Sequence, residues 1–168
     1  MTNRIYSYIV VNPMIKKCKQ GRSKIEEAVE DFKARCRKLG LKVTPQRIAI
    51  YKELIKTDRH PSADALYKTI KNKFPGISLD TVNRALLTFA KHGIAFIVEG
   101  TGQPKRFDAD MLNHQHFICI KCKRIIDFQH RPFDNIKLPA DIENKFMVLK
   151  KTVYVEGICD KCLNKSAN

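Results

Sequence analysis

Four of the six cysteines in the chain form two pairs with the same spacing, Cys119-x-x-Cys122 and Cys159-x-x-Cys162. Two such pairs offer four thiolates, the ligand set that holds Zn²⁺ tetrahedrally in structural sites closed to substrate. The alternatives are two disulfides or a redox-active CxxC motif. A cytosolic setting argues against disulfides, and no thioredoxin-like βαβ pattern supports a redox motif. We therefore expect a structural zinc site at Cys119, Cys122, Cys159 and Cys162, and zinc binding there would contribute directly to folding.

A second group of possible metal ligands precedes the first cysteine pair. His114 and His116 alternate along a predicted strand, so both imidazoles face the same side of it. Asp108 lies shortly upstream, Asp127 lies in the next predicted strand, and His60 lies between two predicted helices. Imidazole and carboxylate without thiolate suit Fe²⁺ or Mn²⁺. A His-x-His pair alone is more often incidental than a metal site, so the residues by themselves leave this second site open.

The elements that must position these ligands begin with four helices. Their starts are marked by a Ser23–Glu26 capping box, by Thr44-Pro45, by Ser62 and by Ser78. The first and last helices end before Gly40 and Gly93, and the third is expected to carry Phe74 and to end at Pro75-Gly76. In the fourth helix the spacing of the apolar residues predicts an inward face of Leu79, Val82, Leu86 and Phe89.

After the fourth helix the period changes. Residues Ile94–Val98 and Arg106–Phe107 flank a glycine-rich turn and predict a short hairpin. Helices followed by a hairpin are typical of a winged helix-turn-helix, in which the fourth helix reads DNA. Asn83 and Arg84 point outward from that helix and could contact adenine and guanine edges, although they could also be simply solvated.

The rest of the chain predicts a second, small α+β domain. Strands are expected over His116–Cys119, Ile125–Phe128 and Thr152–Ile158, with a short helix over residues 139–146. We divide the chain into a basic N-terminal extension (1–22), a winged-helix domain (23–107) and a metal-binding domain (108–168). About 60 residues are few enough that a metal or a partner should be needed for stability.

The charge of the chain favours a polyanionic partner. The net charge is +15, and residues 1–108 hold 22 basic and 10 acidic side chains against 10 and 7 in the remainder. Such an excess in one half fits nucleic acid better than a solubilising surface. No apolar run is long enough for a membrane span, and the short stretch Ile5–Val11 lacks the features of a signal peptide. We expect a cytoplasmic protein.

Several motifs in order resemble the ferric uptake regulator family, and more closely its peroxide-sensing branch. The resemblance covers roughly residues 30–163. It rests on Leu41–Arg47, His60–Asp64, Ser78–Leu86, Arg106–Asp108, His114-x-His116-x-x-Cys119-x-x-Cys122, Ile126–Phe128 and Cys159-x-x-Cys162. It implies a homodimer in which the C-terminal domains associate and the winged helices bind a double-stranded, palindromic operator.

The resemblance also assigns roles to residues. It implies structural zinc at the four paired cysteines and a regulatory Fe²⁺ or Mn²⁺ held by His60, Asp108, His114, His116 and Asp127. DNA contacts are expected from Lys42, Arg47, Thr81, Asn83 and Arg84. The family usually has Tyr where this chain has Asn83, so the operator preference can differ.

Two aspartates suggest which signal is sensed. Asp108 and Asp127 stand where iron-sensing members tend to have Glu. The resemblance therefore implies a repressor, not an enzyme, in which Fe²⁺ reacts with H₂O₂, a ligating His is oxidised and DNA is released. Sensing of iron or manganese levels is the first alternative. A zinc-stabilised nucleic-acid or protein adaptor without a regulatory metal is the second, and a thiol oxidoreductase using the CxxC pairs is a third.

Overall fold

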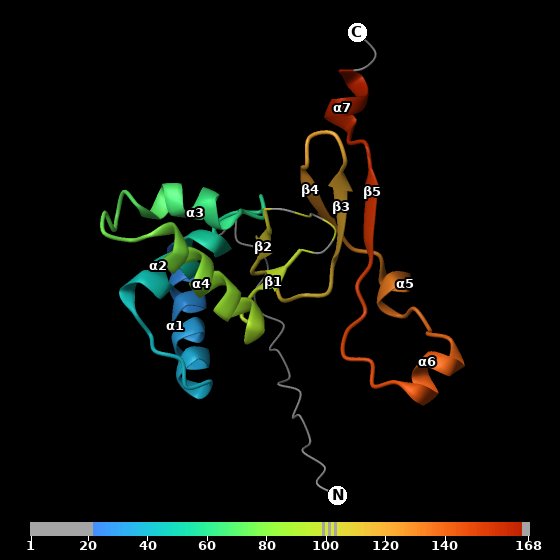
Figure 1. Cartoon of the computed structure of the whole chain (residues 1–168), viewed down its shortest axis with the longest axis horizontal. Helices are drawn as coiled ribbons and strands as arrows, with labels where there is room; N and C mark the ends of the chain where they lie inside the picture. The colour runs from blue at the N-terminus through green and yellow to red at the C-terminus, as the bar shows by residue number, and fades with distance from the viewer. Residues whose placement is uncertain (1–21, 99, 101, 103, 166–168) are drawn as a thin grey trace, which may run out of the picture.

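The structure is a computed structural model that describes residues 22–98, 100, 102 and 104–165. The expected basic extension therefore lies, apart from Arg22, outside the described residues. The remaining chain has a helical half and a sheet half, with a two-stranded hairpin between them (Figure 1). None of the helices in the described part has the length and apolar character needed to cross a membrane.

Four helices make up the first half: α1 Arg22–Lys38, α2 Pro45–Ile55, α3 Ala63–Ile70 and α4 Leu79–Lys91. Three start signals are confirmed, because the side chains of Thr44, Ser62 and Ser78 each accept a hydrogen bond from the main-chain N–H three residues later. The first is wrong in detail, since α1 begins at Arg22 and Ser23 lies within it. Helix α3 also ends at Ile70, before Phe74.

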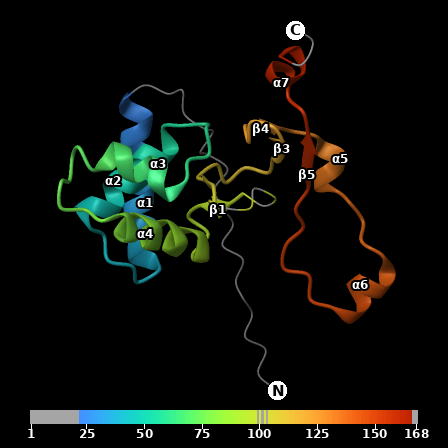
Figure 2. The same cartoon turned by 45° about the horizontal axis from the view of Figure 1, so that its top comes forward.

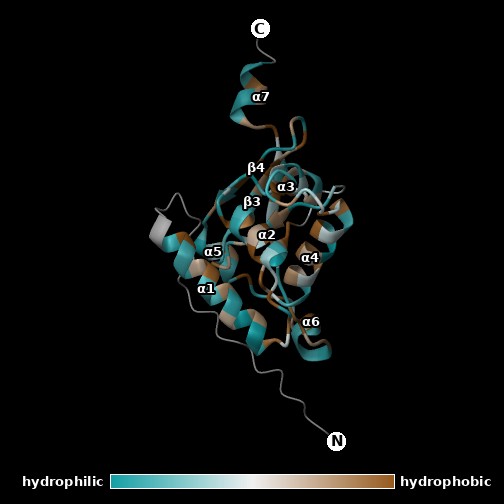
Figure 3. Ribbon diagram, turned by 90° about the vertical axis from the view of Figure 1, so that its left-hand side faces the viewer, coloured by the Kyte–Doolittle hydropathy of each residue, from teal (hydrophilic) through white to brown (hydrophobic). Residues whose placement is uncertain are grey.

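An aromatic cluster forms the centre of the helical core. The ring of Phe32 from α1 stacks on Tyr51 from α2 with centroids 4.3 Å apart, and the edge of Phe89 from α4 meets it at 5.2 Å. Figure 3 shows hydrophilic and hydrophobic residues in turn along α1 and α4, as expected for helices with one buried face. Leu79 was expected to point inward and does not. It is 42% exposed because the first residue of α4 extends beyond the core.

The predicted hairpin is present as β1 Phe96–Ile97 and β2 Phe107–Asp108. The two strands are antiparallel, with Phe96 opposite Asp108 and Ile97 opposite Phe107. Helices α2 to α4 followed by this hairpin form the expected winged helix-turn-helix. Strand β2 crosses the boundary expected between residues 107 and 108, so Asp108 is paired with the wing.

The second half is a three-stranded sheet with small helices. Its strands are β3 Gln115–Cys119, β4 Ile125–Phe128 and β5 Tyr154–Gly157, in the order β4-β3-β5. The β3–β4 pair is antiparallel and the β3–β5 pair is parallel. Helix α6 Ala140–Lys145 was expected, whereas α5 Arg131–Asp134 and α7 Asp160–Asn164 were not predicted. The α+β class and the two-part architecture are confirmed.

The wing lies next to the sheet (Figure 2) and packs against it. Val98, just after β1, is 2% exposed and forms a small hydrophobic cluster with Ile118 of β3 and Ile125 of β4. At the turn, Gly100 has φ +78°, and a Cβ there would lie 2.6 Å from a ring carbon of Tyr154. Only glycine allows the wing to approach β5 this closely.

Candidate metal centres and DNA-binding surface

The four paired cysteines meet at the end of the sheet. Cys119 ends β3, and Cys122 follows in the turn to β4. Cys159 directly precedes α7, and Cys162 lies within it. One sulfur from each lies within 4.8 Å of the others. The Sγ atoms of Cys122 and Cys159 are 3.6 Å apart, close to the roughly 3.8 Å expected between two thiolates on one tetrahedral Zn²⁺. Thiols that converge in this way fit zinc and not two disulfides.

Main-chain donors prepare this cluster for a cation. The pKa of Cys119 is lowered to about 6 by hydrogen bonds from main-chain N–H groups, first that of Cys122 and then that of Cys159. A bound metal needs the thiolate form, so these donors stabilise the form that binds. Hydrogen bonding to Cys122 raises the pKa of Cys162 to about 12.

The five expected regulatory ligands also meet, at the contact between the two halves. One ligand atom from each of His60, Asp108, His114, His116 and Asp127 lies within 4.8 Å of the others. They come from the α2–α3 loop, from β2, from β3 and the segment before it, and from β4. The helical half thus contributes two ligands and the sheet half three, so the set is complete only when the halves are packed together.

Asp108 is the centre of this set. Its Oδ2 lies 3.2 Å from Nε2 of His60, 2.9 Å from Nε2 of His114 and 3.3 Å from Nε2 of His116. Asp127 completes it, with Oδ1 at 2.8 Å from His60 and 3.5 Å from His116. Neighbouring donors on one ion at about 2.1 Å are about 3.0 Å apart, so the arrangement fits a divalent cation. With three nitrogens, two oxygens and no sulfur, the donors suit Fe²⁺ or Mn²⁺.

The orientation and charge of His114 favour metal binding. Its Nδ1 lies 2.7 Å from the carbonyl of Leu112. A carbonyl only accepts, so we assign the proton to Nδ1, which leaves the Nε2 lone pair facing the site. Burial disfavours the charged imidazolium, but hydrogen bonds to Asp108 and to Leu112, together with the charge of Asp127, outweigh burial and raise the pKa of His114. The same negative potential that attracts a proton attracts a metal cation.

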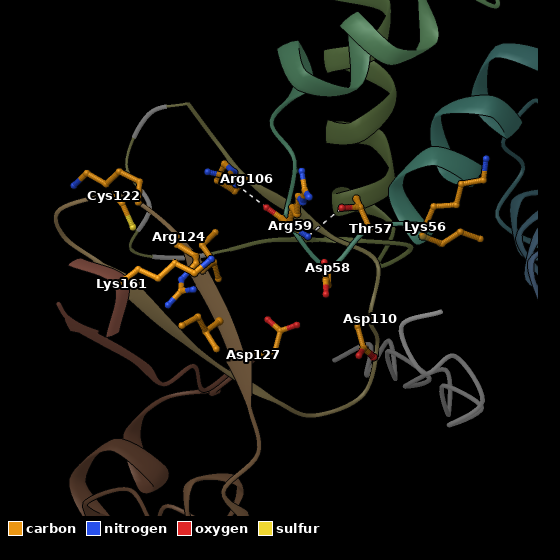
Figure 4. A pocket seen from close by; sticks show the side chains of 14 residues that line it. Lys56, Thr57, Asp58, Arg59, Arg106, Asp110, Cys122, Arg124, Asp127 and Lys161 are labelled. Carbon is orange, nitrogen blue, oxygen red and sulfur yellow. Dashed lines mark hydrogen bonds between the residues drawn. The ribbon is translucent and has the colours of Figure 1, made fainter. Parts of the chain in front are cut away.

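Two cavities give solvent access to the regulatory site. One of about 1280 Å³ lies between the halves and is lined by Asp127 and several basic residues. In Figure 4, Asp58 and Asp127 point into it, with Arg59, Arg106, Arg124 and Lys161 around it. A second cavity, of about 270 Å³, is lined by His114 and His116 on the other side. Asp127, His114 and His116 therefore border solvent-filled space, whereas His60 and Asp108 are buried.

Four of the five expected DNA contacts line one surface cavity. Lys42, Arg47, Thr81 and Arg84 border a hollow of about 520 Å³ between α2 and α4. The guanidinium of Arg47 donates to the Lys42 carbonyl at 2.7 Å, while Arg84 is exposed and 3.7 Å from Asp80. Asn83 lies on α4 and is half-buried but does not line this hollow. The structure thus groups three cations, Lys42, Arg47 and Arg84, on one outer face of the helical half.

Two contributors to the regulatory site were not assigned from sequence. The Leu112 carbonyl orients His114, and a carbonyl has no residue-type signal. Arg106 lies in the Arg106–Asp108 motif, which by itself predicts no role for it. Its guanidinium donates to the carbonyls of Arg59 and His60, and burial lowers its pKa. The signal available in the sequence was its position two residues before Asp108.

Comparison with known proteins agrees with this geometry. A model of the ferric uptake regulator family matches residues 38–156. The peroxide-responsive repressor PerR of Staphylococcus epidermidis is 36% identical over 138 residues, which cover 82% of this chain and 92% of that protein. Among solved structures, the ferric uptake regulator Fur of Helicobacter pylori gives a TM-score of 0.68 at 22% identity, covering 83% of this chain and 93% of that one. A zinc uptake regulator complexed with zinc and DNA gives a TM-score of 0.65 at 21% identity, covering 86% of this chain and 98% of that one. The chain therefore belongs to the ferric uptake regulator family and is similar to its peroxide-responsive repressors.

Proposed function

We propose that this protein is a dimeric, metal-dependent DNA-binding repressor that responds to hydrogen peroxide. The observation that carries the proposal is the convergence of three imidazoles and two carboxylates from both halves of the chain. An ion bound there favours one angle between the halves. In a dimer this angle sets the distance between the two recognition helices, and so the fit to an operator with two half-sites.

In this proposal the two metal sites have different roles. Zn²⁺ at the four cysteines stabilises the sheet half, and Fe²⁺ or Mn²⁺ at the His and Asp cluster reports the signal. Fe²⁺ held by the three imidazoles and two carboxylates would supply one-electron reducing power toward H₂O₂. In the net reaction an imidazole C–H and H₂O₂ would give an imidazole C–OH and water, so that the iron would regain the electron it supplies. An oxidised imidazole is a poorer ligand, so the halves separate and DNA is released. The protein is consumed by its signal and is not an enzyme.

The DNA surface that we propose is the hollow bordered by Lys42, Arg47, Thr81 and Arg84, with Asn83 at its side. Its cations would neutralise phosphates or read guanine edges. Since DNA is the partner, the proposed place of action is the cytosol. Replacing Arg84 with Ala should weaken operator binding and relax base preference. Replacing Lys42, which is expected to contact a phosphate, should weaken binding to all DNA sequences equally.

Dimerisation is assigned to the sheet half. Strand β5 lies at the edge of the sheet, and Tyr154 and Val155 on it are exposed. Phe146, Met147 and Leu149, just before β5, are also exposed, at 62%, 84% and 75%. Contiguous apolar residues on a surface mark a protein interface. Because the family is dimeric, we propose a second copy of this chain as the partner.

The test is mass spectrometry of protein loaded anaerobically with Fe²⁺ and exposed briefly to H₂O₂. One added oxygen atom at His60, His114 or His116, absent when Mn²⁺ replaces Fe²⁺, is the expected result. No such oxidation in protein shown to contain iron would refute peroxide sensing and favour sensing of the metal level.

A variant separates signal from DNA binding. Asp127 contacts both His60 and His116, so Asp127→Glu keeps a carboxylate but moves it by one carbon. We expect it to retain metal-dependent operator binding and to lose much of the oxidation. Equal oxidation of the variant and the wild type would count against the role given to this aspartate. Operator binding that survives removal of the whole cluster would instead favour an adaptor without a regulatory metal.

A further inference from the structure

The main chain of His60 has an unusual conformation. Its φ is +49°, in the left-handed region that side chains other than glycine seldom adopt, and among the described non-glycine residues only Lys123 shares a positive φ. The residue is also followed by proline, which restricts the backbone before it. The side chain is nevertheless buried and points at the other regulatory ligands. Such a conformation persists where surrounding contacts fix it.

The contacts that hold the main chain of His60 come from Arg106, which directly precedes β2, and from Phe107, the first residue of β2. The Arg106 guanidinium donates through Nε to the His60 carbonyl and through Nη2 to the Arg59 carbonyl, the latter at 2.6 Å. Figure 4 draws a dashed line from Arg106 toward the main chain of Arg59. The next N–H, that of Phe107, donates to the Pro61 carbonyl at 3.1 Å. Three consecutive carbonyls around His60 are therefore held by two consecutive residues of the wing.

The same strand also holds the ring of His60. Asp108 follows Arg106 by two residues, which places both side chains on one face of the strand. Its Oδ2 lies 3.2 Å from Nε2 of His60. The strand thus fixes this ligand at its main chain through Arg106 and at its imidazole through Asp108.

We propose that Arg106 is a positioning residue for the regulatory metal. It holds His60 in the left-handed conformation that carries the imidazole to the ion, and it ties that ligand to the wing. The inference rests on the proposed regulatory site and goes beyond it, because Arg106 contacts only the main chain of a ligand residue. Lys cannot replace it: a guanidinium donates to two carbonyls in a fixed plane, and an ammonium does not.

Arg106 could instead act only through its charge, and a neighbouring arginine provides the control. Arg59 lines the same cavity and has an exposed side chain, while its main-chain carbonyl is the acceptor. Arg59→Gln therefore removes a charge from the same place without removing the clamp. Arg106→Lys does the reverse, since it keeps the charge and removes the paired donors.

The experiment measures the dissociation constant of Mn²⁺ from zinc-loaded protein, by the electron paramagnetic resonance signal of free Mn²⁺. We expect Arg106→Lys and Arg106→Gln to weaken Mn²⁺ binding by about 10- to 100-fold, the usual effect of losing a partner that orients a metal ligand. Arg59→Gln should stay within about twofold. Unchanged Mn²⁺ binding in both Arg106 variants, or equal weakening in Arg59→Gln, would overturn the proposal.

A second readout distinguishes positioning from a loss of overall stability. In the Fe²⁺ and H₂O₂ assay, the share of oxidation at His60 should fall in Arg106→Lys relative to His114 and His116. Simple destabilisation would leave that share unchanged, and an unchanged share would overturn the proposal even if Mn²⁺ binds more weakly. Mn²⁺ binding that survives His114→Ala would refute the regulatory site itself, which is a separate outcome.

Discussion

Val98 connects the wing with the sheet, so its truncation should weaken metal binding without touching a ligand. Its side chain is 2% exposed and packs with Ile118 and Ile125 from the sheet half. Val98→Ala deletes two carbons, worth about 2 kcal/mol once the cavity left behind is included. This contact exists only when the halves are packed together, and the regulatory ligands converge only in that arrangement. The loss can therefore weaken Mn²⁺ binding by up to about 30-fold.

The assay is Mn²⁺ titration of zinc-loaded protein, with Val82→Ala as the matched control. Val82 is fully buried in the helical core, so the same deletion there costs stability within one half only. We expect its Mn²⁺ affinity to stay near that of the wild type, although its midpoint of urea unfolding falls. A Val98→Ala protein that binds Mn²⁺ no more weakly than Val82→Ala would refute the claim that the wing contact favours the metal-binding arrangement.

Three further perturbations test zinc, pH and capping. Cys162→Ser should leave the sheet half unfolded, because zinc contributes on the order of 10 kcal/mol to the folding of small zinc domains. A native circular dichroism spectrum of this variant, or of wild-type protein after zinc is removed by a chelator, would contradict this. Burial raises the pKa of Tyr51 from 10.0 to about 12. The unfolded chain therefore releases this proton first, and stability should fall as pH rises from about 10 to 12, by about 2–3 kcal/mol in total. Comparison of urea midpoints with Tyr51→Phe isolates this part, and parallel pH profiles of the two proteins would argue against it. Ser78→Ala removes the cap that accepts from the Thr81 N–H at 3.1 Å and should cost about 1 kcal/mol in thermal unfolding, with weaker operator binding. An unchanged thermal midpoint would show that the cap contributes little.

Features that depend on near neighbours in the chain were predictable from sequence. The caps at Ser62 and Ser78 accept from N–H groups three residues later, so the signal and its effect share one short segment. The two cysteine pairs are equally local. The short helices α5 and α7 were missed because four and five residues are too few to show a helical period.

Features that join distant segments of the chain could not be predicted from sequence alone. Nothing in the spacing of His60 and Asp108 places them 3.2 Å apart, and only the resemblance to a family suggested that they share a site. The clamp of Arg106 was less visible still, because its acceptors are main-chain carbonyls that every residue carries. Leu79 shows the opposite failure: its spacing fits the apolar face of α4, but the position lies past the end of the core.

Strand β3 has a consequence for how the protein would integrate two inputs. It carries His116 of the proposed regulatory site and, three residues later, Cys119 of the proposed zinc site, so about 10 Å of extended strand joins the two sites. We expect zinc at the cysteines to order the end of this strand and, with it, the position of the His116 imidazole. DNA binding would then require both metals. Zinc would be needed for the structure, and only the second metal would respond to the signal. We therefore expect zinc depletion to weaken metal-dependent DNA binding even when the second metal is plentiful.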